Sequence, residues 1–137
     1  MLRIIIGDAT FEVDFPTTAG YSYRESEEHC GCAFCRNFYQ ALDENYPKIR
    51  DFLANFGIDA EAPDHMIPKL LQDGKIAYSP EYKVFGTMNH SICLELALDN
   101  ALVTFAPAGE DTFDITVKNL VLPWVLTEPM PSANAIP

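Results

Sequence analysis

The strongest constraint on the fold is a change in the spacing of apolar residues along the chain. Residues 2–6 and 11–15 are rich in β-forming side chains, and the second segment alternates strictly between apolar and polar. Apolar residues then recur at helical intervals over residues 33–57, and residues 75–119 again have the pattern of short strands. Strands, then helices, then strands indicate an α+β fold rather than alternating α/β units.

The N-terminal half is predicted to begin with a β-hairpin whose loop is residues 7–10. No apolar period is visible over residues 16–28, so a loop leading to the cysteines is expected there. Two helices should follow, one over residues 33–45 and one over residues 47–57, with a proline at the first turn and a glycine at the end. We interpret their apolar stripes as core.

The C-terminal half is predicted to be mostly strand. Residues 64–72 form a short helical candidate, capped by Asp64 and interrupted by Pro68, before a turn. In the segment 91–98 the leucines should face the core, which places Cys93 on the opposite face. An antiparallel meander sheet is expected from five segments, at about residues 75–79, 82–88, 91–98, 101–106 and 112–119.

The length of 137 residues matches one domain with a real core. We expect a single α+β zinc-binding domain over residues 1–129, followed by a flexible C-terminal tail over residues 130–137. The segment 122–126, which carries the only tryptophan, should pack as a cap on this domain.

The chain is strongly acidic, with a formal charge of −11. Its carboxylates are scattered rather than collected in a tail, so the whole body would repel phosphate backbones and anionic lipids and attract basic surfaces. Direct binding to nucleic acid or membrane is therefore disfavoured, although acidity also serves solubility alone. No signal peptide or transmembrane segment is visible, and a cytoplasmic location is expected.

Cys30, Cys32 and Cys35 lie within six residues. In a reducing compartment such a cluster is more typical of a metal site than of disulfides. Cys32 and Cys35 have the C-x-x-C spacing, which lets two thiolates reach one ion from a loop that enters a helix. Three thiolates need one more ligand for tetrahedral zinc, so we expect a structural Zn²⁺ that staples the loop at the helix entry. Three reduced cysteines without metal are the alternative.

The fourth ligand would come from Cys93, His29, His65 or His90. We favour Cys93, because it would complete an all-sulfur set and close a long loop, where a staple stabilises most in principle. His29 is the next candidate, although a ligand directly adjacent to Cys30 is geometrically awkward.

Two enzymatic functions are alternatives to a structural metal site. A dithiol oxidoreductase would also place C-x-x-C at a helix start, but its βαβ context is missing. A zinc hydrolase would need an open coordination position and a carboxylate base, for which Glu27 and Glu28 are candidates. The patterns of zinc deaminases and serine hydrolases are absent, and the cysteine spacing does not match ferredoxin clusters.

Several segments resemble a family of small proteins from Gram-positive bacteria and their mobile elements. They are residues 32–38 (Cys-Ala-Phe-Cys-Arg-Asn-Phe), 52–53, 57–59 with Pro63, and 123–126 (Pro-Trp-Val-Leu). The resemblance spans about residues 30–129, but the family has no established general activity to carry over.

The small, acidic and cysteine-clustered character of the chain is also similar to that of the zinc-containing type II-A anti-CRISPR proteins, which block Cas9 by binding it. This resemblance implies a protein-binding inhibitor whose acidic face docks on a basic partner, most specifically Cas9. Glu25, Glu27 and Glu28, just before the cysteines, are the candidates for that face. The alternatives are a thiol or zinc enzyme and a zinc-stabilised housekeeping domain.

Overall fold

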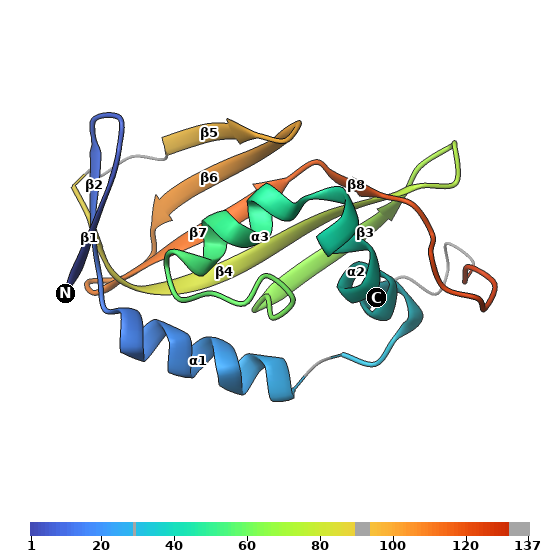
Figure 1. Cartoon of the computed structure of the whole chain (residues 1–137), viewed down its shortest axis with the longest axis horizontal. Coiled ribbons are helices and arrows are strands. Elements are labelled where there is room, and N and C mark those ends of the chain that lie inside the picture. Colours follow the sequence, from blue (N-terminus) through green and yellow to red (C-terminus); the bar gives the residue numbers. More distant parts are fainter. Residues whose placement is uncertain (29, 90–93, 132–137) are drawn as a thin grey trace.

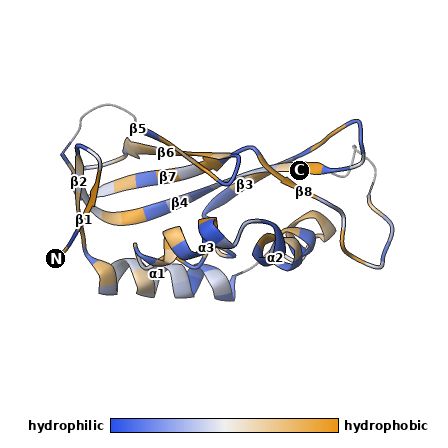
Figure 2. Ribbon diagram, turned by 45° about the horizontal axis from the view of Figure 1, so that its top comes forward, coloured by the Kyte–Doolittle hydropathy of each residue, from blue (hydrophilic) through white to orange (hydrophobic). Residues whose placement is uncertain are grey.

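The computed structural model describes residues 1–28, 30–89 and 94–131. Within these ranges, three helices lie on one side of an eight-stranded antiparallel sheet (Figures 1 and 2). The predicted α+β class is therefore confirmed. The helices are α1 (Phe15–Glu27), α2 (Ala33–Asn45) and α3 (Pro47–Ala54). The strands are β1 (Leu2–Ile6), β2 (Ala9–Val13), β3 (His65–Leu70), β4 (Ile76–Met88), β5 (Leu94–Leu98), β6 (Ala101–Pro107), β7 (Thr112–Lys118) and β8 (Leu120–Leu122).

The long strand β4 organises the sheet, whose strand order is β1-β2-β4-β7-β6-β5. The first half of β4 pairs with β3 and β8, and its last residues pair with β2. Of the five segments predicted to form a meander, the last three do so as β5, β6 and β7, and β7 rather than β5 then pairs with β4. All of these pairings are antiparallel, as expected from the sequence.

The two strands predicted at residues 75–79 and 82–88 are one continuous strand, which corrects the sequence-based expectation. The break was placed at Pro80, because proline cannot donate a backbone hydrogen bond. In the structure Pro80 falls between Tyr78, which pairs with β8, and Glu81, which pairs with β7. At this junction between two partner strands the missing N–H interrupts no ladder.

The stretch predicted as a loop at residues 16–28 is instead helix α1, so that prediction was wrong. Asp14 caps the start of this helix, because its carboxylate accepts a hydrogen bond from the Thr17 N–H at 3.2 Å. Its buried side chains are Thr18 and Ser22, which are polar, so the sequence carries no apolar stripe there.

Thr18 has a structural task at the edge of β4, whereas the Ser22 hydroxyl accepts a hydrogen bond from the Asp59 N–H in the loop after α3. Residues 82–85 of β4 lie between the part that pairs with β3 and the part that pairs with β2, and on this edge their backbone N–H groups bind side chains instead of a strand. The Lys83 N–H donates to Asp64 Oδ2 at 2.7 Å, and the Phe85 N–H donates to Thr18 Oγ1 at 3.0 Å. Helix α1 therefore covers a segment of sheet edge that would otherwise stay unpaired.

The helix predicted over residues 64–72 is also wrong, because His65–Leu70 forms strand β3. Strand β3 lies outside the main strand order and pairs with β4. A proline such as Pro68 is tolerated in a strand whose other edge is open. Asp64 does not cap a helix but accepts hydrogen bonds from the Lys83 N–H and from the Tyr21 hydroxyl.

The core lies between the helices and the sheet. The apolar stripes predicted for α2 and α3 are buried, as expected, and Gly57 takes a positive φ of 87° after α3. Aromatic rings from three parts of the chain meet there, with Phe11 and Phe113 centroids 5.3 Å apart and Phe11 and Phe56 centroids 5.8 Å apart. The segment around Trp124 packs on this core as a cap, and Met130 also contacts it.

No helix within the described residues is long and apolar enough to cross a membrane. Residues 132–137, most of the predicted tail, lie outside the described residues.

Candidate metal centre

Three cysteines meet where the loop from α1 enters α2, as predicted: Cys30 and Cys32 lie in the loop and Cys35 lies in the first turn of α2. The Cys32 side chain caps α2, because its sulfur accepts a hydrogen bond from the Cys35 N–H at 3.4 Å. The Cys30 sulfur accepts one from the Cys32 N–H at 3.5 Å. The start of a helix thus turns all three sulfur atoms toward one point, and they lie within 4.8 Å of one another.

This sulfur set fits a zinc ion. Tetrahedral zinc with Zn–S bonds of about 2.3 Å needs sulfur atoms roughly 3.8 Å apart. The three sulfur atoms lie within 4.8 Å of one another, so side-chain rotations alone could bring the three thiolates onto one ion. Cys30 is exposed, and Cys32 and Cys35 are half-buried, which leaves the point reachable from solvent.

Local contacts act differently on the thiols. Hydrogen bonds from the backbone and side chain of Cys32 lower the pKa of Cys30. Burial raises the pKa of Cys35, and hydrogen bonds with Cys32 and Cys30 add to that effect. A metal that binds here must therefore displace the proton of Cys35, so affinity should rise with pH.

Within the described part of the chain, no fourth His, Cys, Asp or Glu joins this group. His65 can be placed: it lines a surface pocket with Glu81 and Asp114, whereas its neighbour Met66 lines the pocket beside the cysteines. Adjacent strand residues point to opposite faces, so His65 points away from the cluster.

Three candidate ligands, Cys93, His29 and His90, lie outside the described residues, and their roles stay predictions. The strand that follows Cys93, β5, lies at the sheet edge remote from the start of α2 (Figure 1).

The acidic candidates lie beside the cysteines. Glu25 and Glu28, at the end of α1, line a cavity of about 230 Å³ together with Cys30, Cys35 and other residues of the 62–66 segment and α2. Glu27 is not among the residues that line it. Two of the three predicted partner-binding carboxylates therefore share one hollow with the thiols.

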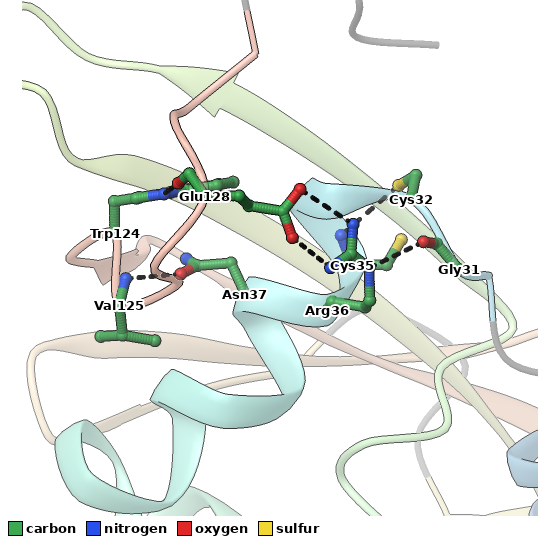
Figure 3. A network of polar contacts seen from close by, with 8 residues as sticks. All are labelled: Gly31, Cys32, Cys35, Arg36, Asn37, Trp124, Val125 and Glu128. Carbon is green, nitrogen blue, oxygen red and sulfur yellow. Dashed lines mark hydrogen bonds and ion pairs between the residues drawn. The ribbon is translucent and has the colours of Figure 1, made fainter.

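Sequence reasoning did not assign a site role to the two residues after Cys35. The Arg36 Nε donates to the Gly31 carbonyl at 2.9 Å, and its guanidinium forms an ion pair with the Glu128 carboxylate (Figure 3). The Asn37 side chain accepts from the Val125 N–H at 2.7 Å. The only available signal was that Arg36, Asn37 and Val125 fall in stretches that carry the family resemblance, whereas Gly31 and Glu128 do not.

Comparisons of the chain with protein-family models, with curated proteins and with solved structures found no match. The two resemblances drawn from the sequence therefore stay predictions.

Proposed function

We propose that Cys30, Cys32 and Cys35 bind one structural zinc ion and that the chain is a non-enzymatic, acidic protein-binding domain. The observation that carries the proposal is the convergence of three sulfur atoms within 4.8 Å at the start of α2. Sulfur-rich zinc sites are usually closed and structural. A metal here joins the end of α1 to the start of α2, so its binding energy becomes folding energy.

Elemental analysis of the purified chain, with a thermal melt before and after chelation, tests the metal. The expected result is one equivalent of zinc, whose removal lowers the melting temperature. X-ray absorption at the zinc edge of the wild type and of Cys93→Ser, His29→Ala and His90→Ala variants identifies the fourth ligand. A chain that binds no zinc after reduction and reconstitution would refute the proposal.

The partner we propose is a protein with a basic surface, and the chain would act as its inhibitor. The net charge of −11 and the placement of Glu25 and Glu28 beside the metal loop support this reading. Complementary charge raises association rates and favours partners of opposite sign. In its most specific form, the partner is Cas9, as the resemblance to type II-A anti-CRISPR proteins implies.

A pull-down against Cas9 over a series of salt concentrations tests this partner. Binding should weaken with salt and in the double variant Glu25→Gln/Glu28→Gln. The matched control is Glu44→Gln/Asp51→Gln, which removes the same charge from exposed positions of α2 and α3. Equal losses in both double variants, or affinity independent of salt, would contradict an acidic docking face at the end of α1.

One observation favours a second candidate, a zinc hydrolase. The cavity that holds Glu25 and Glu28 also reaches Cys30 and Cys35, so a fourth coordination position on that side would face carboxylates able to act as a base. The same absorption spectrum decides between the two. Four protein ligands support the structural site, whereas three sulfurs and an exchangeable oxygen support the hydrolase.

A further inference from the structure

Two segments far apart in sequence meet at the start of α2. One is the cysteine loop, and the other is residues 123–128, which we call the C-terminal strap. The ring of Trp124 packs edge-on against Phe34 of α2, with the centroids 5.9 Å apart. The indole N–H also donates to the backbone carbonyl of Glu128 at 2.8 Å, which folds the strap back on itself.

One end of the strap is fixed by a buried side chain. Asn37 is 0% exposed, accepts from the Val125 N–H at 2.7 Å and donates to the Pro123 carbonyl at 3.1 Å. Its amide also lies 3.4 Å from the Tyr78 hydroxyl, which donates to the Phe34 carbonyl at 2.7 Å. These contacts do not involve the cysteine loop, so they hold this end of the strap whether or not metal is bound.

The other end of the strap is held through Arg36, and this side chain also contacts the cysteine loop. Its two terminal nitrogens donate hydrogen bonds to the two carboxylate oxygens of Glu128, while its Nε donates to the Gly31 carbonyl (Figure 3). Gly31 lies between Cys30 and Cys32. A metal bound by those two sulfurs would therefore fix the position of the carbonyl that orients Arg36.

We propose that Arg36 couples metal binding in the cysteine loop to docking of the C-terminal strap. This inference rests on the proposed zinc site. Metal binding orders Gly31, the ordered carbonyl holds the guanidinium, and the guanidinium holds Glu128 and the fold of the strap around Trp124. Loss of the metal frees the loop and releases the Glu128 end, while Asn37 keeps the Val125 end in place.

Coupling of this kind is reciprocal, because each event changes the free energy of the other by the same amount. Removal of the Glu128 carboxylate should therefore weaken zinc binding, although this residue is no ligand. Both partners of the ion pair are 43% exposed, which limits the pair's strength. We expect a loss of about fivefold in zinc affinity, at the low end of known couplings.

The experiment compares the wild type with Glu128→Ala, Arg36→Lys and a control, Asp43→Ala. Asp43 forms an exposed ion pair with Arg50. Asp43→Ala therefore also removes the carboxylate partner of an arginine, but at a position away from the strap. Zinc affinity is measured by competition with a chromophoric chelator. Docking is followed by the emission of Trp124, the only tryptophan of the chain.

Zinc should shift the emission of the wild type and of Asp43→Ala to shorter wavelength. In Glu128→Ala and Arg36→Lys the shift should shrink and the affinity should fall by about fivefold. Wild-type affinity in both strap variants would overturn the coupling, even if their melting temperatures fall. Zinc binding by the wild type without any change in emission would also overturn it, whereas absence of zinc binding would overturn the proposed function itself.

Discussion

Replacement of Asn37 by Ala is predicted to destabilise the chain strongly. The substitution removes the acceptor of the Val125 N–H and the donor to the Pro123 carbonyl, at a site that is 0% exposed. A buried polar group left without a partner costs about 1–3 kcal/mol, and two such groups result here. Some water can reach the strap, so we expect a loss of about 3 kcal/mol, a large share of the roughly 5–15 kcal/mol typical of a domain.

The assay is urea unfolding, followed by the emission of Trp124 and by circular dichroism, with a thermal melt in parallel. At this chain length the predicted loss corresponds to a melting temperature about 10 °C lower. The control is Asn45→Ala on the same helix, where the amide is exposed and donates only to the Ala41 carbonyl. That variant should lose less than about 1 kcal/mol. If both variants lose the same stability, Asn37 does not anchor the strap as described.

Three further predictions concern the metal, the sheet and the half-buried carboxylate of Asp114. Cys32→Ser should lower the melting temperature of zinc-loaded protein and abolish the effect of chelation, because it removes a proposed ligand while the serine hydroxyl can still cap α2. Gly86→Ala should prevent stable folding, since a Cβ there would lie 2.1 Å from the Glu12 carbonyl oxygen. A soluble Gly86→Ala protein that unfolds cooperatively would contradict this prediction. The control is Gly20→Ala in α1, which should be neutral or stabilising. Burial raises the pKa of Asp114 from its ordinary 3.8, so the folded chain holds this proton more tightly than the unfolded chain and stability falls as pH rises through the folded value. Asp114→Asn should therefore raise the free energy of unfolding at pH 7, and urea titrations below about pH 3.8 should show no gain.

The predictability of each element followed the chemistry of its buried face. Helices α2 and α3 bury apolar stripes at helical spacing, and both were found from the sequence. Helix α1 buries Thr18 and Ser22, whose hydroxyl groups bind backbone atoms of β4 and of the loop after α3, so apolar spacing gave no signal. Strand β3 was missed because Asp64 has the residue type of a helix cap, and only pairing with β4 shows that the segment after it is a strand.

The site divides in the same way. The convergence of Cys30, Cys32 and Cys35 could be predicted because the three residues lie within six positions of the sequence, at a helix start whose geometry is local. The contacts of Arg36 and Asn37 with the strap join residues about ninety positions apart. Sequence spacing contains no information about such contacts, because they depend on where the folded sheet places residues 123–128.

The pairing of the earliest strands with late ones also determines how the chain can fold while it is made. Phe11 in β2 pairs with Met88 at the end of β4, and its ring packs against Phe113 in β7. Ribosomes add about 5–20 residues per second, so roughly 5–20 s pass between the synthesis of Phe11 and that of Phe113. During that interval the nascent hairpin and helices have no sheet to cover their aromatic faces. Nascent chains that have not yet completed β7 are therefore expected to need chaperones, and folding should be limited by the last third of the chain.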